Sequence, residues 1–317
     1  MSLNILALHP LTSQQTTTIS AIRDDVCINS CKVANAVQYM PETDILLSFE
    51  QTNLVPLLDN APRLKWIHAL TAGVERFFQI PGFAKSDILL TNSRGIHGIP
   101  VAEQVLGIML NSSRCLFTSY EQQKKHLWKR IPNTDELYEK TVAIIGLGSI
   151  GREIAKRTKS LGMNVLAVKR EKTTEPFVDQ LYSLDDLTVV LNTADYVVVT
   201  LPLTDKTKNM FTLPIFKQMK TSAYFINVSR GPIVSETDLC AALTEDIIHG
   251  AALDVFCEEP LPESSPLWDT KNLLITPHNS ASSPYYIDRT LRIFNENLRH
   301  FPQSSEMINL IDKTRGY

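Results

Sequence analysis

The chain has 317 residues, which is long for one hydrophobic core and fits two domains of ordinary size. Hydrophobic residues make up 44% of it and charged residues 21%, a composition typical of globular proteins. The formal net charge is −3, and the basic residues form no run longer than a pair. These values argue against nucleic acid as a partner.

The opening stretch from Met1 to Pro10 is apolar but has no basic region, so it is interpreted as a strand rather than a secretion signal. No apolar stretch approaches the roughly 18 to 20 residues of a membrane helix. The five cysteines are scattered, and none has the spacing of a zinc site. We therefore expect a cytoplasmic protein with reduced thiols, no metal ion and no membrane partner.

Short runs rich in β-branched residues alternate with helical patterns along the chain, which indicates an α/β fold built on parallel sheets. The strands predicted in the first part are Asn4–Leu8, Ile45–Phe49, Trp66–Leu70 and Ile88–Thr91. A long helix is predicted to start near Pro100, because apolar residues recur at helical spacing on one face of the segment that follows.

The alternation of strands and helices becomes more regular from Val142 onward. The strands predicted there are Val142–Ile145, Val165–Val168, Tyr196–Thr200, Phe225–Val228, Ala251–Phe256 and Leu273–Thr276. These runs are almost continuously apolar, as expected of a parallel sheet covered on both faces. Helices are predicted at Arg152–Leu161 and, after the last strand, at Tyr285–Phe301.

A glycine motif follows the strand that ends at Ile145 and opens a helix. Gly146, Gly148 and Gly151 have the spacing G-x-G-x-x-G, which in dinucleotide folds permits a tight turn, close approach of the pyrophosphate and close helix packing. The helix N-terminus supplies N–H groups for the phosphates. The sequence therefore predicts a dinucleotide site that includes Ser149 and Ile150, with a glycine-rich turn of no function as the alternative.

The next strand ends in Lys169 and Arg170, where an NAD site usually has an acidic residue for the ribose hydroxyls. Two cations suit the 2′-phosphate of NADP(H) instead. We therefore expect NADP(H) as the preferred cofactor, with NAD(H) possible. A solvated basic pair is the alternative, and Glu171 directly after it would weaken the effect.

Arg230, Glu259 and His278 follow the ends of three successive predicted strands. Each residue alone has an ordinary explanation, as a loop salt bridge, a helix cap or a polar turn residue. Ligands bind at the carboxyl ends of strands in open α/β sheets, so the three side chains are expected to converge in one crevice. Together they offer an anion binder, a carboxylate and an acid/base group.

The chain resembles the D-isomer-specific 2-hydroxyacid dehydrogenases from about residue 40 to its end. The matching stretches are Thr71–Glu75, Asn92–Gly95, Val101–Glu103, Gly146–Gly151, Leu201–Thr204 with Thr207, Asn227–Pro232, Ala252–Phe256 with Glu259-Pro260, Pro266–Trp268 and Thr276–His278. Their order and spacing make the resemblance specific.

The resemblance implies roles for particular residues. Arg230 is expected to bind the substrate carboxylate and carbonyl, His278 to be the acid/base that also contacts the substrate, and Glu259 to pair with His278 and favour its charged form. The backbone at Ala72 and Gly73 is expected to contact the substrate. The cofactor neighbours that the resemblance adds to the phosphate loop are Leu201, Pro202, Thr207, Val228, Ser229 and Asp254.

The resemblance also implies the architecture, which is two Rossmann-like parallel-sheet domains with a cleft between them. Residues 1–94 and 284–317 are expected to form a flavodoxin-like substrate-binding domain, and residues 95–283 a dinucleotide-binding Rossmann domain. Members of the family are usually homodimers, with the long helix from Pro100 and the arm carrying Trp128 at the subunit contact.

The expected function is NAD(P)H-dependent reduction of a small 2-keto acid to the D-2-hydroxy acid, and the reverse reaction. Two alternatives are a non-enzymatic, dinucleotide-sensing protein of the corepressor type and an enzyme like phosphoglycerate dehydrogenase. Only about 40 residues follow His278, which argues against the longer phosphoglycerate dehydrogenases, and Glu259 argues against formate dehydrogenases. The sequence does not decide whether Phe49, Trp128 and Trp268 line the substrate pocket or pack within the protein.

Overall fold

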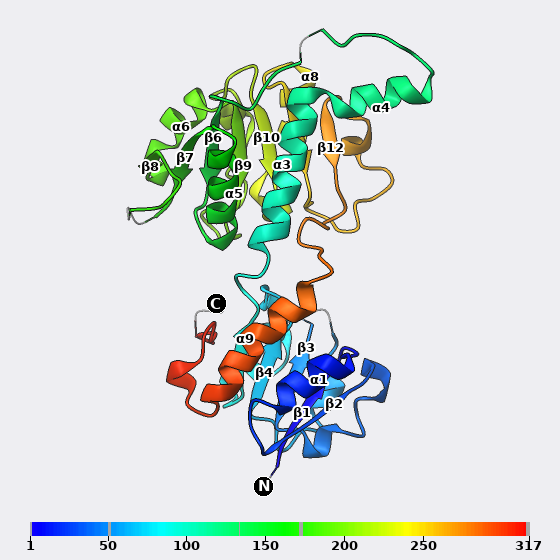
Figure 1. Cartoon of the computed structure of the whole chain (residues 1–317). Coiled ribbons are helices and arrows are strands. Elements are labelled where there is room, and N and C mark those ends of the chain that lie inside the picture. Colours follow the sequence, from blue (N-terminus) through cyan, green and yellow to red (C-terminus); the bar gives the residue numbers. More distant parts are fainter. Residues whose placement is uncertain (1, 50–51, 133, 171–173, 315–317) are drawn as a thin grey trace. The chain divides into compact units, whose positions relative to one another are not determined.

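The chain folds into two compact domains (Figure 1). The computed structural model describes residues 2–49, 52–132, 134–170 and 174–314, so Met1 and Glu171, named above, lie outside the described residues. The terminal domain comprises Met1–Ile96 and Ser283–Tyr317, and the central domain comprises His97–Ser282. Within the described ranges, no helix is long and apolar enough to cross a membrane.

The terminal domain contains one parallel sheet of five strands in the order β2-β1-β3-β4-β5. The strands are β1 (Leu3–Ala7), β2 (Val26–Ser30), β3 (Ile45–Ser48), β4 (Trp66–Ala69) and β5 (Leu89–Asn92). Its α-helices are α1 (Ser13–Ser20), α2 (Val55–Leu58) and α9 (Tyr286–His300), and its 3₁₀ helices are Val33–Asn35, Met40–Glu42, Glu75–Gln79, Phe83–Lys85 and Ser304–Glu306. This strand order is that of flavodoxin.

Helix α9 returns the end of the chain to the terminal domain. Its apolar residues Leu291, Phe294 and Leu298 are buried on one face at helical spacing. Phe294 stacks on Trp66 of β4 with ring centroids 5.0 Å apart. The contact explains why residues near the C-terminus belong to the same domain as the first strands.

The central domain contains a parallel sheet of seven strands in the order β12-β11-β10-β9-β6-β7-β8. The strands are β6 (Thr141–Ile145), β7 (Asn164–Val168), β8 (Gln180–Tyr182), β9 (Tyr196–Val199), β10 (Tyr224–Asn227), β11 (Gly250–Leu253) and β12 (Leu273–Ile275). Its α-helices are α3 (Gly98–Arg114), α4 (Leu116–Lys124), α5 (Ser149–Ser160), α6 (Leu187–Thr193), α7 (Leu213–Phe216) and α8 (Glu236–Thr244), with 3₁₀ helices at Leu184–Asp186, Gly231–Ile233 and Pro266–Asp269. The order is that of dinucleotide-binding folds, so the predicted fold class is confirmed.

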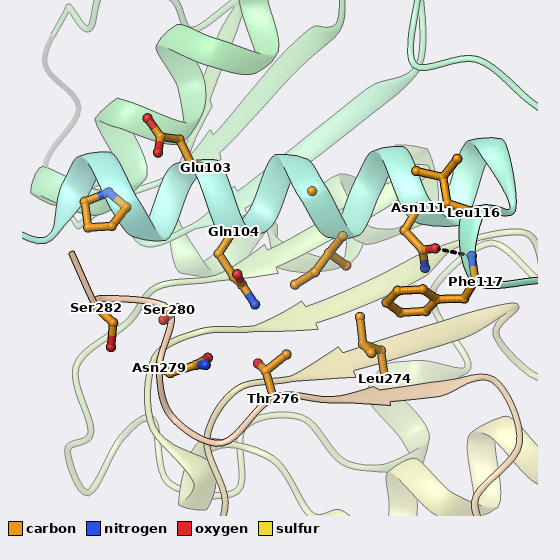
Figure 2. A pocket seen from close by; sticks show the side chains of 13 residues that line it. Glu103, Gln104, Asn111, Leu116, Phe117, Leu274, Thr276, Asn279, Ser280 and Ser282 are labelled. Carbon is orange, nitrogen blue, oxygen red and sulfur yellow. Dashed lines mark hydrogen bonds between the residues drawn. The ribbon is translucent and has the colours of Figure 1, made fainter. Parts of the chain in front are cut away.

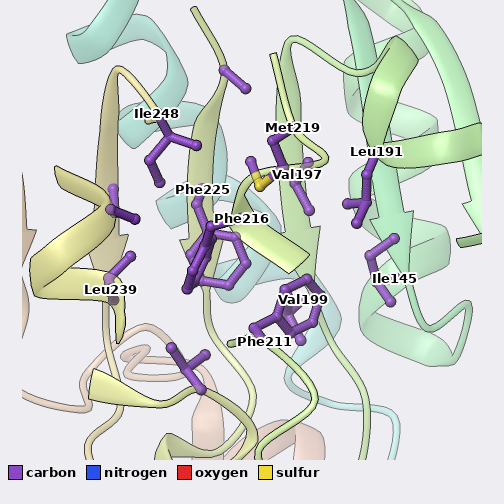
Figure 3. Packing of buried hydrophobic residues seen from close by; sticks show 14 of the residues in the cluster. Ile145, Leu191, Val197, Val199, Phe211, Phe216, Met219, Phe225, Leu239 and Ile248 are labelled. Carbon is purple, nitrogen blue, oxygen red and sulfur yellow. The ribbon is translucent and has the colours of Figure 1, made fainter. Parts of the chain in front are cut away.

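Both faces of the central sheet are covered by helices. On one face Phe211, Phe216 and Phe225 pack together with centroids 5.0 to 6.3 Å apart, next to Val197 and Val199 (Figure 3). Helices α3 and α5 bury their apolar residues in a second cluster. The almost continuous apolar character of these strands follows from this double coverage.

The predicted elements differ from the structure mainly at their ends. The strand predicted as Ala251–Phe256 ends at Leu253, because the backbone turns where the buried Asp254 collects hydrogen bonds from the next loop. The long helix begins at Gly98, close to the predicted Pro100, and α5 begins at Ser149, within the glycine motif, rather than at Arg152. Strands β2 and β8 were not predicted, because both are short edge strands with polar, partly exposed residues.

Candidate active site

The glycine motif forms the turn between β6 and α5. Gly146 has a φ of +104°, and a Cβ there would lie 3.0 Å from the backbone of Thr200 and Leu201. A Cβ on Gly151 would lie 2.4 Å from the carbonyl oxygen of Gly146, so this glycine permits close packing of helix on strand. A Cβ on Gly148 would meet no protein atom within 4 Å. The open space lies over the turn, where a bound group would approach.

The N-terminus of α5 is suited to a pyrophosphate. None of the side chains that the structure describes caps it, so the N–H groups of its first turn, which includes Ser149 and Ile150, are not satisfied by a cap. Gly148 precedes this turn in an extended conformation. Backbone N–H groups and the helix dipole favour an anion here, so these residues fit the phosphates of a dinucleotide.

The loop after β9 lies directly against the phosphate turn. Thr200 Oγ1 donates a hydrogen bond to the Gly146 carbonyl, and Leu201 and Pro202 follow. Thr207 is buried and closes this loop, since its hydroxyl donates to the Pro202 carbonyl at 2.7 Å and accepts from the Thr204 N–H at 2.8 Å. β6 and β9 are neighbours at the point where the strand order reverses, which is where such sheets bind ligands.

The basic pair after β7 is only partly available to a ligand. Lys169 Nζ lies 2.6 Å from Glu175 Oε1, and Arg152, in the first turn of α5, contacts both oxygens of the same carboxylate at 2.8 Å. Arg170 is exposed. The sequence showed the cations of this cluster but gave no indication of Glu175 as their partner.

His278 follows β12 and pairs with Glu259. Its Nδ1 lies 2.7 Å from Glu259 Oε2, and the two side chains are 48% and 36% exposed. The other oxygen of Glu259 accepts a hydrogen bond from the Phe256 N–H at 2.9 Å. An ionised carboxylate only accepts hydrogen bonds, so Nδ1 carries a proton and Nε2 is left to exchange one with a ligand. The pair therefore has the arrangement of an oriented acid/base group.

The backbone of His278 is in the left-handed region, with a φ of +49°. This region is uncommon for residues other than glycine, and strain of this kind clusters at functional sites. The conformation is held by hydrogen bonds from the His278 N–H to the Asp254 carbonyl at 2.8 Å and to the Thr276 carbonyl at 3.0 Å.

Asp254 organises the loop that carries His278. It is 1% exposed, and its carboxylate accepts from the Thr276 hydroxyl at 2.5 Å and from the backbone N–H groups of Asn279 and Ser280 at 3.1 Å each. Sequence reasoning gave Asp254 only as a cofactor neighbour. The structure places both of its oxygens within the protein, where they fix the turn on which His278 stands.

Arg230 lies on a hydrogen-bonded turn after β10. Its side chain is exposed, and its Nη1 donates to the Ser229 carbonyl at 2.8 Å. Buried Asn227 holds the turn, accepting from the Ser229 N–H and hydroxyl and donating to the Arg230 carbonyl at 3.1 Å. Val228, like Ser229, is buried. A Cβ on Gly231 would lie 1.9 Å from the Phe256 carbonyl carbon, so the turn packs against the segment that leads to Glu259.

His97 is a neighbour of Arg230 that sequence reasoning missed. It is partly buried at the N-terminus of α3, and burial together with the charge of Arg230 lowers the pKa of His97 to about 4. The ring is therefore neutral near physiological pH. In the sequence, the available signal was a titratable residue directly before Gly98. A Cβ on Gly98 would lie 2.8 Å from the Glu153 side chain of α5, so the start of α3 packs closely on α5.

In the terminal domain, the loop after β4 is fixed by its carbonyl groups. Buried Ser93 donates its N–H to the Thr71 carbonyl at 2.9 Å, and Asn92 Nδ2 donates to the Ala72 carbonyl at 2.6 Å. The Thr71 hydroxyl donates to the Gly73 carbonyl at 2.8 Å. The predicted substrate contacts Ala72 and Gly73 thus lie in a loop of defined conformation.

The three aromatic residues left open by the sequence lie in different surroundings. Phe49 follows β3 and stacks on Tyr286 with ring centroids 6.3 Å apart. Trp268 Nε1 donates to the Pro262 carbonyl at 2.9 Å, within its own loop. Trp128 is fully exposed.

Comparison with known proteins gives one consistent family. The family model described as "D-isomer specific 2-hydroxyacid dehydrogenase, NAD binding domain" matches residues 106–280. Glyoxylate/hydroxypyruvate reductase B of Citrobacter koseri is 32% identical over 257 residues, which cover 79% of this chain and 79% of that protein.

Solved structures agree over the whole chain. A D-isomer specific 2-hydroxyacid dehydrogenase family protein from Aeromonas salmonicida is 35% identical with a TM-score of 0.89, and 99% of this chain and 100% of that one are covered. A D-isomer specific 2-hydroxyacid dehydrogenase from Xanthobacter autotrophicus, solved with NADPH and MES, is 27% identical with a TM-score of 0.82, and both chains are covered completely.

Proposed function

The chain belongs to the D-isomer specific 2-hydroxyacid dehydrogenase family, as its motifs predicted, and we propose that it reduces a small 2-keto acid to the D-2-hydroxy acid and catalyses the reverse reaction. Membership makes it an NAD(P)-dependent 2-hydroxyacid oxidoreductase. The observation that carries the finer proposal is the 2.7 Å contact between His278 Nδ1 and Glu259. It lies on loops that follow β11 and β12, at the carboxyl edge of the sheet that also carries the phosphate loop.

The proposed mechanism assigns proton transfer to His278. A nicotinamide cofactor, held at the phosphate loop, supplies the hydride chemistry when bound. Reduction of a keto group leaves an alkoxide that needs a proton, and the Nε2 proton of His278 is the one this side chain can give. Glu259 keeps the ring oriented through Nδ1.

Arg230 is proposed to bind the substrate. Its planar guanidinium can hold a carboxylate through two parallel hydrogen bonds and polarise the adjacent keto oxygen. The Asn227 contacts give the turn a fixed direction. We also propose that the backbone of Ala72 and Gly73 contacts the substrate.

Glyoxylate and hydroxypyruvate are the substrates we propose first, because the similar protein from Citrobacter koseri is named for reducing them. NADP(H) is proposed as the preferred cofactor, supported by Lys169 at the end of β7 and by the NADPH in the Xanthobacter autotrophicus structure. A charge-assisted hydrogen bond to the 2′-phosphate contributes about 1.5 to 3 kcal/mol, which is roughly one to two decades of preference.

The test is a panel of 2-keto acids from glyoxylate through hydroxypyruvate and pyruvate to branched and aromatic acids. Each is supplied with NADPH and with NADH, and nicotinamide oxidation and product chirality are measured. We expect the highest kcat/KM with a small acid and NADPH, and D products from the acids that give a chiral centre. A silent panel would contradict the proposed activity, and equal kcat/KM for the two cofactors would contradict the NADPH preference.

We further propose that the protein is a homodimer. No residue of α4 is buried, and Phe117, Tyr120 and the fully exposed Trp128 present apolar surface on it and on the arm that follows. A groove beside Phe117 runs between α3 and the loop after β12, where Gln104 and Asn279 face each other (Figure 2). Exposed aromatic side chains gathered in one region are typical of an interface.

Light scattering tests the dimer. We expect twice the 35.6 kDa mass of the chain at micromolar protein, and a shift toward the monomer in Trp128→Glu, because the charge would be buried in the contact. A wild-type monomer at that concentration would contradict the proposal.

A further inference from the structure

The cluster around Glu175 is unusual because one carboxylate neutralises two cations from separate elements. Lys169 at the end of β7 contributes a contact of 2.6 Å, and Arg152 in the first turn of α5 contributes two contacts of 2.8 Å. The Glu175 side chain is only 5% exposed, whereas that of Arg152 is 48% exposed. The carboxylate is thus enclosed by its partners rather than displayed on the surface.

The cluster lies at the end of β7 and the start of α5, next to the phosphate loop. In dinucleotide folds, the end of the second strand, beside the phosphate loop, is where the ribose hydroxyls or the 2′-phosphate are recognised. Lys169 and Arg152 together make an anion site there, with a point charge and a planar fork. Glu175 already supplies the oxygens that a phosphate monoester would bring to the same donors.

We propose that Glu175 is an intramolecular competitor for the 2′-phosphate of NADP(H) and thereby limits the preference for NADP(H) over NAD(H). The inference rests on the proposed function, which places NADP(H) at this site. Binding of the 2′-phosphate displaces the carboxylate from Lys169 and Arg152, and the free energy of that ion pair is subtracted from the affinity. NAD(H) lacks the 2′-phosphate and leaves the carboxylate where it is.

A purely structural role for Glu175 makes the opposite prediction. If the carboxylate only positions Lys169 and Arg152, its removal leaves the two cations less ordered and weakens the binding of a 2′-phosphate. If it competes, its removal takes away the carboxylate that a 2′-phosphate has to displace and strengthens that binding. The sign of the change therefore separates the two roles.

The test is calorimetric binding of 2′,5′-ADP and of 5′-AMP to the unchanged protein and to Glu175→Gln. Loss of a competing charge is expected to tighten 2′,5′-ADP binding about tenfold, while 5′-AMP binding changes less than about twofold. Asp185→Asn is the matched control, since it removes one negative charge from an exposed residue of the same domain, and it should leave both affinities unchanged.

A second variant makes the result independent of any general effect of the substitution. In Lys169→Gln with Glu175→Gln, the gain in 2′,5′-ADP affinity should be largely lost, because a cation that the carboxylate neutralised is gone. Unchanged or weaker 2′,5′-ADP binding in Glu175→Gln would overturn the inference. Failure of the proposed function gives a different result, namely no reduction of any keto acid with either cofactor, whatever the ADP affinities.

Discussion

Two histidines in the two domains show how surroundings assign a role to the same side chain. His278 lies on a loop of the central domain, is 48% exposed, and has a carboxylate 2.7 Å from one ring nitrogen. His68 lies in β4 of the terminal domain, is fully buried, and contacts the hydroxyl groups of Thr91 at 2.8 Å and Ser93 at 3.3 Å. Burial lowers the pKa of His68 to about 3, so its ring stays neutral.

The contacts of His68 also fix which nitrogen carries its proton. Trp66 Nε1 can only donate, and it donates to the Thr91 hydroxyl at 2.8 Å. A hydroxyl has one proton, and Ser93 gives its proton to the Ala69 carbonyl, so Ser93 accepts from His68 Nε2 and the neutral ring accepts the Thr91 proton at Nδ1. Ser93 in turn donates to the Ala69 carbonyl at 2.8 Å. The chain of hydrogen bonds has one direction from end to end.

The comparison teaches that a carboxylate and access to solvent prepare a histidine for proton transfer, whereas hydroxyls and burial make it part of the scaffold. Both roles bear on the proposed reaction. Ser93, which the network holds, donates its N–H to the Thr71 carbonyl and so supports the loop that contains Ala72 and Gly73. We therefore propose His68 as a positioning residue, beside the proposed proton donor His278.

The largest effect is expected from His278→Ala. Proton transfer by a positioned side chain contributes about 10² to 10⁴-fold, so kcat for keto acid reduction should fall by that factor. NADPH binding, followed by its fluorescence, should stay within about twofold, because the ring is not among the proposed cofactor contacts. His249→Ala, at an exposed residue of the same domain, is the control and should keep full activity. A kcat loss below about threefold in His278→Ala would contradict the proposed role of His278 in proton transfer.

A smaller loss is expected from Arg230→Lys. A lysine keeps the charge but cannot form two parallel hydrogen bonds with a carboxylate. One charge-assisted bond contributes about 1.5 to 3 kcal/mol, so kcat/KM should fall by roughly 10 to 100-fold, with KM raised and kcat lowered. Steady-state kinetics across keto acid concentrations separates the two parameters. An unchanged KM would mean that Arg230 does not hold the substrate.

The smallest effect on turnover, and a specific effect on stability, is expected from His68→Gln. In the folded protein His68 takes up no proton until about pH 3, whereas in the unfolded chain it does so below about pH 6.5. The unfolded state binds more protons between these values, so the free energy of unfolding falls as pH falls, by about 1.4 kcal/mol per pH unit from this group.

The variant should therefore lose this contribution to the acid dependence, although its stability at neutral pH is lower. Denaturant unfolding at several pH values measures it, with His249→Gln at an exposed histidine as the control. A variant with the same acid slope as the unchanged protein would show that His68 is not held neutral. The keto acid KM is expected to rise more than kcat falls, because the loop of Ala72 and Gly73 is less well ordered.

The sequence was most informative where a physical constraint is local. Buried parallel strands are recognised in the sequence as apolar runs. Gly146 and Gly151 occupy positions where a Cβ would come too close to backbone atoms. Edge strand β2 was missed because Val26–Ser30 includes polar residues and none of its residues is buried. The division of the chain into two domains depends on α9 packing against β4, a contact between distant parts of the sequence.

The arrangement of the candidate site was harder to predict, because its contacts join residues far apart in sequence. The resemblance suggested the pairing of Glu259 with His278. Nothing local in the sequence shows that Asp254 holds the turn at residues 276–280, or that Glu175 neutralises Lys169 and Arg152. His97 also becomes informative only when the fold brings it near Arg230.

The central claim, that surroundings assign opposite roles to the two histidines, is tested most directly by NMR of the ring nitrogens in protein labelled with ¹⁵N-histidine. Signals are assigned with His68→Gln and His278→Ala. We expect His68 to keep a single neutral form with its proton on Nε2 from about pH 8 to about pH 5. The His278 nitrogens, but not those of His68, should respond to Glu259→Gln. A His68 ring that gains a proton in this range, or a His278 ring that does not respond to the loss of the Glu259 charge, would contradict the claim.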